Sequence, residues 1–584
     1  MPTLIHATHE AAYKVGGIGA VLDGLLSAPA YLARVQRSIV VGPMDTRDPA
    51  EMDRLFASRN NLFVRYFSDR GMMACDPALA NALSDIEAAF GVRLCYATRQ
   101  FGGAVHELLL VDAAEARPDR YDGFKYFVWR RFGLDCSRYG GVEEFNHFMR
   151  MAEPSAAALN AILDGDAAAP EPRWVVCHEF MGLPLWYGLE LARPGAYRSA
   201  YVAHEVPTAR ALVEGDGGHD TRFYNVLRQA LPRGLTVEQV FGDWSGYFKH
   251  GLVRTAAQCD VVMAVGDPVV DELRFLDPGF RDKPISLIYN GVPSQRITLG
   301  DTRLSSARLK EFARRMIGIG PTWVFSHVTR MVPSKGLWRD LRVMEKLDSH
   351  LSWRGESAVH FMLSSVRPAG RSSADAWRMS QAYGWPGRHH FGWPDLVDPE
   401  DILYRAIADF NATARASRVI LVNQFGWDRE RIGALMPEDM RFGDLRAGSD
   451  LEFGQSIYEP FGIAQMEPLS AGALCVVSDS CGCVGFARQA VRDLGDAAGP
   501  FNNVRVVDYT SLYDLGERDP LSIGTQERNQ VEQRAADAAS WFIIDSLPRS
   551  AGRKQQLIDT GFAMAGRMSW NVVAGERMLP AMGL

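Results

Sequence analysis

Glu459 and Glu467 lie eight residues apart on either side of the sequence Pro-Phe-Gly, where we expect a strand to end and a short helix to begin. Carboxylates accept hydrogen bonds from hydroxyl groups, and the free N–H groups at the start of a helix suit an anionic ligand. After them, Ala473–Val477 is an apolar run typical of a buried parallel strand. The spacing indicates a site for a ligand with hydroxyl groups and negative charge, although two solvated glutamates on an amphipathic segment are the simpler alternative.

Arg330 and Lys335 lie five residues apart on a loop that contains Pro333 and Gly336. The loop follows an apolar stretch, Trp323–Val328, in which we expect a buried strand. An arginine binds phosphate as a planar fork and a lysine as a point charge, so both side chains could contact one diphosphate. A solvated loop is the alternative for such a pair taken alone.

His178 directly follows Trp174–Cys177, an apolar stretch that predicts another strand. In open α/β sheets ligands bind outside the carboxyl ends of the parallel strands, which is where this histidine would lie. A core histidine with satisfied hydrogen bonds is the alternative. His204 and Arg210 follow a second such stretch, Tyr201–Ala203, and a surface position is the alternative for the arginine.

The elements expected near the start of the chain have a similar order. Thr3–Ala7 predicts a strand and Ala20–Leu26 a helix, and the loop between them contains Lys14, Gly16 and Gly17. A strand, a glycine loop and a helix allow backbone N–H groups to approach a phosphate. The glycine spacing is not that of a nicotinamide-binding loop. The alternation of strands and helices predicts an α/β protein.

The composition limits the classes of protein to consider. The 584-residue chain exceeds what one hydrophobic core usually supports, so two domains of about 250 residues each are expected. A net charge of -7 gives no electrostatic footprint for nucleic acid, and no apolar run approaches the ~20 residues of a membrane span. The eight cysteines are scattered without a zinc-binding spacing, which favours a reduced, cytoplasmic protein without a metal site.

Three motifs together resemble those of the retaining GT-B glycosyltransferases, and most of all those of the glycogen and starch synthases. The segment of the two glutamates reads Y-E-P-F-G-x-x-x-x-E-P-L-S-A-G, and the loop of the two cations reads R-M-V-P-S-K-G. The first glycine loop lies in H-E-A-A-Y-K-V-G-G-I-G-A-V-L. The resemblance implies a GT-B fold, in which two Rossmann-like domains face each other across a cleft and a C-terminal helix crosses back to the first domain.

The resemblance also implies a role for each matching residue. Glu459 would contact the hydroxyl groups of a donor sugar, and Glu467 would hold the ribose of its nucleotide. Pro468 departs from the family pattern, and since it lacks an N–H it is expected to kink or delay the helix. The residues with an implied catalytic role are His178, Arg330, Lys335 and Glu459. Those with an implied role in binding the donor or its nucleotide are Lys14, Gly16, Gly17, Arg210, Asn290, Tyr458, Phe461, Gly462, Ile463, Glu467 and Gly482.

The expected domain boundaries follow the same family pattern. Residues 1–295 form an acceptor-side Rossmann-like domain, 296–320 an irregular polar linker, and 321–550 a Rossmann-like domain that binds the nucleotide-sugar. A helical insertion at about 364–446 interrupts the second domain, and 551–584 is the C-terminal helix that returns to the first. The insertion is interpreted as a contact with a polymer or, in a homo-oligomer, with another copy of the chain. Ordinary packing between helices is the alternative.

The expected function is that of a glycogen synthase-like, retaining glucosyltransferase. It would move glucose from an NDP-glucose donor, UDP- or ADP-glucose, to the non-reducing end of a glucan or oligosaccharide acceptor. No metal or other cofactor is expected, because Arg330, Lys335 and backbone amides can stabilise the charge of the leaving diphosphate. One alternative is another retaining GT-B transferase that acts on a small sugar, a lipid or a different polysaccharide. The other is a catalytically silent GT-B protein that binds carbohydrate or regulates a partner.

Overall fold

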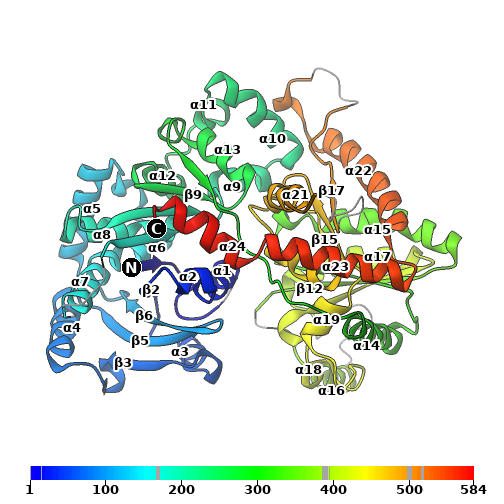
Figure 1. Ribbon diagram of the computed structural model, residues 1–584, viewed down its shortest axis with the longest axis horizontal. Helices are drawn as coiled ribbons and strands as arrows, with labels where there is room; N and C mark the ends of the chain where they lie inside the picture. The colour runs from blue at the N-terminus through cyan, green and yellow to red at the C-terminus, as the bar shows by residue number, and fades with distance from the viewer. Residues whose placement is uncertain are drawn as a thin grey trace. The chain divides into compact units, whose positions relative to one another are not determined.

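The computed structural model describes residues 2–14, 16–165, 171–367, 369–383, 392–393, 395–495, 503–513 and 518–584. They form two compact units, each built on its own sheet (Figure 1). Unit 1 consists of Met1–Ala209, Gln229–Gly291 and Trp570–Leu584, and unit 2 consists of Arg210–Arg228 and Val292–Ser569. Neither unit is therefore one continuous stretch of the chain.

The described residues of unit 1 form a ten-stranded sheet in the order β10-β9-β8-β7-β1-β2-β6-β5-β3-β4. The strands from β10 to β6 run parallel, whereas β5, β3 and β4 are antiparallel to their neighbours. The strands are β1 (Thr3–Ala7), β2 (Arg37–Pro43), β3 (Phe63–Phe67), β4 (Met72–Met73), β5 (Arg93–Phe101), β6 (Ala104–Asp112), β7 (Arg173–His178), β8 (Arg198–Ala203), β9 (Val261–Ala264) and β10 (Ile285–Leu287).

The helices of this half of the chain connect the strands of the sheet, and the helical residues within Arg210–Arg228 belong to unit 2. They are α1 (Gly17–Leu26), α2 (Pro29–Leu32), α3 (Pro49–Leu55), α4 (Pro77–Phe90), α5 (Pro118–Phe132), α6 (Glu143–Arg150), α7 (Ala152–Asp164), α8 (Leu183–Ala192), α9 (Pro207–Gly215), α10 (His219–Ala230), α11 (Val237–Phe241), α12 (Phe248–Thr255) and α13 (Asp267–Leu276). Helices α24 (Trp570–Val572) and α25 (Leu579–Ala581) return to unit 1 at the C-terminus.

The described residues of unit 2 form a seven-stranded sheet in the order β13-β14-β12-β11-β15-β16-β17, in which all neighbours are parallel. The strands are β11 (Trp323–Val328), β12 (Ala358–Ser364), β13 (Gly392–Trp393), β14 (Ser417–Asn423), β15 (Leu451–Gly454), β16 (Leu474–Ser478) and β17 (Val504–Val507). The helices are α14 (Leu299–Ile317), α15 (Leu337–Arg354), α16 (Ser373–Tyr383), α17 (Asp398–Thr413), α18 (Arg429–Ile432), α19 (Phe442–Gly448), α20 (Ile463–Met466), α21 (Cys483–Leu494), α22 (Thr525–Ser546) and α23 (Ala551–Arg567).

Strand β11 shows why the apolar runs of the sequence become central strands. Phe325 lies in a core with Leu347 of α15 and Ile543 of α22, whereas Val324 lies in a second core with Phe312 of α14. Helices thus cover both faces of the sheet, and a strand covered on both faces needs apolar side chains at successive positions. The strands expected at the start of the chain, before His178, after Gly320 and after Gly472 are all present.

Each sheet has a switch point beside its first strand, where the chain continues on opposite sides of that strand. In unit 1 the chain adds β2 on one side of β1 and β7 on the other, and in unit 2 it adds β12 on one side of β11 and β15 on the other. Ligands of open α/β sheets bind outside the carboxyl ends of the strands at such a switch point. The loops after β1, β7, β11 and β15 are therefore the places to look for a site.

Three expected boundaries are wrong. The segment 296–320 is not an irregular linker, because Leu299–Ile317 forms helix α14, whose first turn is held by a capping box of Thr298 and Asp301. The segment 364–446 is not a purely helical insertion, because it contains strands β13 and β14 of the sheet. Parts of it, residues 368, 384–391 and 394, lie outside the described residues. The return to unit 1 begins at Trp570 rather than at 551.

Candidate functional site

In unit 2 the loops after β11 and β15 are joined by backbone hydrogen bonds. The Ser334 carbonyl, on the R-M-V-P-S-K-G loop, accepts from the N–H groups of Ile457 (2.8 Å) and Tyr458 (3.1 Å). Gly336 ends this loop with a positive φ of 58°, and a Cβ there would lie 2.6 Å from the Gln455 carbonyl oxygen. The close approach of the two loops therefore requires glycine at this position.

Lys335 and Glu459 form an ion pair across these two loops. The lysine Nζ donates to the glutamate Oε2 at 2.5 Å, and both side chains are almost completely buried. The Gln465 side chain also approaches the same carboxylate oxygen, at 3.5 Å. Two residues found by separate motifs are thus brought together at the switch point between β11 and β15.

The loop after β16 completes this arrangement. The Gly482 N–H donates to the Glu459 carbonyl and the Cys483 N–H donates to the Phe461 carbonyl, each at 2.9 Å. The resemblance to the synthases implied that Gly482 binds the ligand, but its N–H already donates to a carbonyl group of the protein. Gly462 has a φ of 93°, and a Cβ there would lie 2.7 Å from Gln465 Oε1.

The segment after Gly462 forms only one helical turn. Helix α20 begins at Ile463, which is half-buried, and ends at Met466, where a 3₁₀ helix, Glu467–Ala471, takes over. Pro468 lies in the first turn of this 3₁₀ helix, as expected from its missing N–H. Tyr458 and Phe461, by contrast, are buried core residues.

Glu467 pairs with Arg446, a residue that the sequence analysis missed. Arg446 Nη2 lies 2.8 Å from Glu467 Oε2, and its Nη1 lies 3.1 Å from Oε1 of the fully buried Glu452. Glu452 is an acid inside the apolar strand β15, and a buried carboxylate needs a cation or hydrogen-bond donors. An acid within this apolar stretch of the sequence could therefore have predicted a nearby arginine.

Two further cations belong to this region of unit 2. Arg330 is exposed and forms no ion pair with the residues that the structure describes. Its guanidinium is therefore available to a ligand. Arg210 pairs with Glu214 at 3.1 Å, and the same carboxylate accepts from the Ser334 N–H at 3.2 Å. Arg210 thus lies beside the R-M-V-P-S-K-G loop, in a segment that the sequence analysis placed in the first domain.

In unit 1 the glycine loop after β1 holds a carboxylate of the protein itself. Glu10 Oε2 accepts from the N–H groups of Gly16 (2.6 Å) and Gly19 (2.9 Å) at the start of α1. A Cβ at Gly17 would meet no neighbouring atom, and Lys14 is exposed, with its Nζ 3.7 Å from Asp23. The loop binds an anion as its geometry predicts, but in this structure the anion is Glu10, which sequence reasoning did not identify.

His178 ends β7 with both ring nitrogens in hydrogen bonds. Its Nδ1 lies 3.0 Å from His204 Nε2, and its Nε2 lies 3.0 Å from His6 Nδ1. Burial lowers the pKa of His178 to about 3 and the pKa values of His6 and His204 well below the ordinary value. His178 therefore offers no free nitrogen, and His204, which is partly exposed, ends the series of rings.

Asn290 is buried in unit 1, and the glycine after it has a packing role. A side chain at Gly291 would collide with the indole ring of Trp570, as would one at Gly24 of α1. Gly291 and Gly24 therefore leave the space that the Trp570 ring occupies within unit 1.

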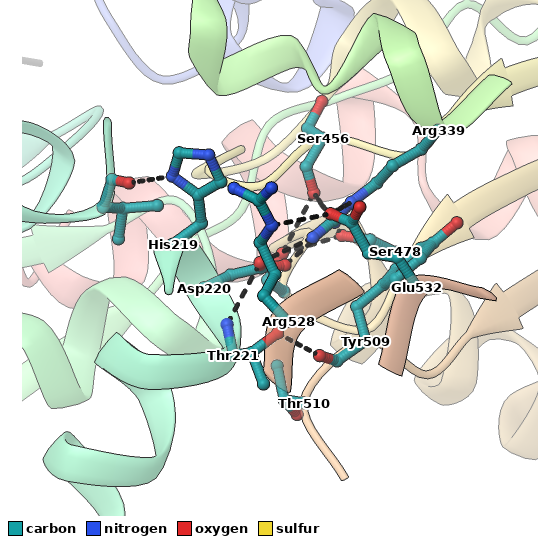
Figure 2. Close-up of polar contacts among 12 residues, drawn as sticks. His219, Asp220, Thr221, Arg339, Ser456, Ser478, Tyr509, Thr510, Arg528 and Glu532 are labelled. Carbon is teal, nitrogen blue, oxygen red and sulfur yellow. Dashed lines mark hydrogen bonds and ion pairs between the residues drawn. The ribbon is translucent and has the colours of Figure 1, made fainter. Parts of the chain in front are cut away.

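A buried ion network in unit 2 was also missed (Figure 2). Arg339 of α15, fully buried, donates to both oxygens of Asp220 of α10, at 2.6 and 2.9 Å. Its Nε donates to Glu532 of α22 at 2.9 Å, and its guanidinium carbon lies 3.8 Å from the centre of the Tyr509 ring. Burial alone would raise the pKa of Glu532, but Arg339 and Arg342 outweigh it and the pKa is lowered. This network fastens α10 to unit 2.

Two features do not occur in the part of the chain that the structure describes. Its His, Cys, Asp and Glu residues form no group of three or more that could hold a metal ion. None of its helices combines the length and the apolar character needed to cross a bilayer. All eight cysteines are free thiols.

Comparison with known proteins supports the fold. No protein-family model and no curated protein matches the chain. The two units with parallel strands have the GT-B fold, which confirms the predicted architecture. The catalytic domain of starch synthase IV from Arabidopsis thaliana, bound to ADP and acarbose, is 16% identical with a TM-score of 0.51, and the match covers 98% of this chain and 97% of that one.

Two other solved structures match over a similar length. A UDP-forming α,α-trehalose-phosphate synthase from Burkholderia vietnamiensis is 12% identical, with a TM-score of 0.45 and 100% of both chains covered. A sucrose-phosphate synthase from Thermosynechococcus elongatus is 12% identical, with a TM-score of 0.45, and the match covers 99% of this chain and 97% of that one. At these identities the likeness concerns the fold, and the chemistry must be argued from the site.

Proposed function

We propose that this chain is a retaining glucosyltransferase that moves glucose from a nucleoside-diphosphate glucose to the non-reducing end of an α-glucan. The observation that carries the proposal is the Lys335–Glu459 ion pair at the switch point of the unit 2 sheet. It joins a loop suited to a diphosphate with a segment suited to sugar hydroxyl groups. The motif resemblance to glycogen and starch synthases supports the choice of glucose and glucan.

The proposed reaction breaks the bond between the anomeric carbon and the diphosphate oxygen. A hydroxyl group of the acceptor forms the new bond on the same face, and its proton goes to the leaving phosphate. Negative charge grows on the diphosphate as the bond breaks, so cations fixed nearby lower the barrier. Arg330, exposed and without a recorded partner among the described residues, and Lys335, held by Glu459, are the groups proposed for this role.

The remaining residues of the site would orient the donor. Glu459 accepts from Lys335 with one oxygen, and its other oxygen has no recorded partner among the described residues, so it is proposed to accept from a sugar hydroxyl. Glu467, about a third exposed and held in place by Arg446, is proposed to accept from the ribose. We propose that these side chains act without a metal or other cofactor, since the two cations proposed to bind the diphosphate can balance its charge.

The first experiment measures nucleotide release from UDP-, ADP- and GDP-glucose, with and without glycogen. Release from one glucose donor that depends on glycogen supports the proposal and identifies the base. Nucleotide release that does not depend on glycogen but increases with a small sugar or a lipid would support a transferase and reject the proposal of a glucan acceptor. Donor binding without any turnover would favour a silent, carbohydrate-binding protein.

Variants test the proposed roles. We expect Lys335→Ala or Arg330→Ala to lower turnover by about 10²-fold or more, which is the usual loss when one charge-stabilising donor is removed. Lys346→Ala, on helix α15 of the same unit, is the matched control and should retain the wild-type rate. Near-normal rates in both site variants would reject the assignment of the two cations.

A further inference from the structure

A continuous series of hydrogen bonds crosses the unit 1 sheet from strand to strand. It runs from His204 to His178 (3.0 Å), to His6 (3.0 Å), to the Tyr31 hydroxyl (2.9 Å) and to Ser38 (2.8 Å). His204 follows β8, His178 ends β7, His6 lies on β1 and Ser38 lies on β2, and these four strands are neighbours in this order. We call these five residues the histidine chain.

The three imidazoles of the histidine chain are neutral at pH 7, because burial disfavours the charged form. A neutral imidazole has one N–H donor and one nitrogen lone pair. His6 and His178 use both ring nitrogens within the chain, so each must donate to one neighbour and accept from the other. The tautomer of one ring therefore fixes the tautomer of the next, and only two arrangements of the whole series exist.

Tyr31 decides between these two arrangements. Its hydroxyl lies between a ring nitrogen of His6 and the hydroxyl of Ser38, and it is fully buried. A phenol is a stronger acid than an alcohol, and a neutral imidazole nitrogen is a stronger base than a hydroxyl oxygen. The favoured pairing has Tyr31 donating to His6 Nε2 while Ser38 donates to Tyr31.

We propose that Tyr31 is a positioning residue that, as the donor to His6 Nε2, fixes His6, His178 and His204 in the Nδ1–H tautomer. His6 Nδ1–H then donates to His178, and His178 Nδ1–H donates to His204 Nε2. His204, half-buried at the end of the series, then has an Nδ1–H for which no described residue is an acceptor, and this N–H is the proposed donor to a ligand oxygen, such as that of a sugar hydroxyl or a phosphate. This last step rests on the proposed function, whereas the tautomer assignment does not.

Nitrogen-15 NMR of the protein labelled at histidine tests the assignment directly, because protonated and unprotonated ring nitrogens differ widely in chemical shift. At pH 7 we expect the three rings to show a protonated Nδ1 and an unprotonated Nε2. Single replacements His6→Asn, His178→Asn and His204→Asn identify their signals. A wild-type spectrum with Nε2–H in these rings would overturn the proposal, and this outcome needs no variant to fold.

Removal of the Tyr31 or Ser38 hydroxyl group tests which of the two residues sets the donor–acceptor direction of the hydrogen bonds in the histidine chain. Tyr31→Phe deletes the donor to His6, so the signals of all three rings should move toward a mixture of tautomers. Ser38→Ala leaves that donor in place, so the three rings should keep the Nδ1–H form. Tyr197→Phe is the matched control, because it deletes a buried hydroxyl that donates to Asn160 in the same unit. Unchanged signals in Tyr31→Phe would overturn the role of the tyrosine.

Measurement of kcat tests separately whether the His204 Nδ1–H donates to the ligand. We expect Tyr31→Phe to lower kcat by about tenfold, roughly what one hydrogen bond contributes, while Tyr197→Phe stays at the wild-type rate. If the tautomers change and kcat does not, His204 does not present its donor to the reacting ligand. If the wild-type protein shows no glucosyl transfer at all, the proposed function fails, and the spectra still decide the tautomers.

Discussion

The two units bury titratable side chains in opposite ways. The histidine chain of unit 1 holds three rings that burial keeps neutral, and each ring is satisfied by hydrogen bonds to the next. The ion network of unit 2 holds a guanidinium and two carboxylates, all fully buried, and each carboxylate is bound to the guanidinium (Figure 2). Burial raises the pKa of Asp220 although Arg339 opposes the shift, whereas at Glu532 burial is outweighed by the surrounding cations, which lower its pKa. Burial disfavours charge in both places, and only the presence of a matching partner decides whether charge persists.

This difference has a functional meaning. A neutral ring can change which nitrogen carries the proton without moving charge, so it can transmit the identity of a donor over several residues. A fixed ion pair cannot do this, but it holds two segments of the chain in one geometry. The histidine chain is therefore suited to a site, and the ion network to architecture.

The largest expected effect comes from breaking the ion network. Arg339→Met leaves Asp220 buried without a cation, so unit 2 should lose about 3–5 kcal/mol of stability. Urea unfolding checks this, with Arg354→Met at the exposed end of the same helix as the matched control. The double variant Arg339→Met with Asp220→Leu should recover much of the loss, because Glu532 keeps Arg342 as a partner. Equal stability of the wild-type protein and Arg339→Met would contradict a network in which charge persists by pairing.

A smaller effect concerns the neutral rings and pH. His178 has a folded-state pKa of about 3, whereas the unfolded ring titrates near 6.5, so the unfolded state binds more protons between these values. Its contribution to stability is therefore complete above pH 6.5 and is lost as the pH falls, by about 2 kcal/mol between pH 6.5 and 5. We expect His178→Asn to make the pH dependence of urea unfolding shallower by this amount. His350→Asn, in unit 2, controls for the loss of a histidine elsewhere, and parallel curves for wild type and His178→Asn would reject a neutral buried ring.

The smallest effect separates two contacts of Tyr509. Tyr509→Phe keeps the ring under the Arg339 guanidinium and removes only the hydroxyl that donates to Gln455, so a loss of about 1 kcal/mol is expected. Tyr509→Leu removes both contacts and should cost more. If the two variants unfold at the same urea concentration, the ring does not contribute to holding the cation.

The central strands were predictable, because apolar runs are typical of buried parallel strands. The proximity of Lys335 and Glu459 was predictable too, because residues that follow neighbouring parallel strands lie at the same edge of the sheet. Helix α14 was missed because it is mostly polar, although Thr298, Asp301 and Gly318 gave its capping signals. The assignment of Arg210–Arg228 to unit 2 had no local signal. It depends on contacts between residues far apart in the sequence, such as the pair of Asp220 and Arg339, which are 119 residues apart.

The pair of Asp220 and Arg339 determines which segments of the chain are needed to produce unit 2 on its own. A fragment that encodes residues 292–569 contains every described strand of the unit 2 sheet, yet it lacks Asp220, the bidentate partner of a fully buried guanidinium. Exchange of this unit between chains of the same fold would have to carry residues 210–228 as a separate insert. During synthesis, the early segment must wait for more than a hundred later residues before its carboxylate meets its cation.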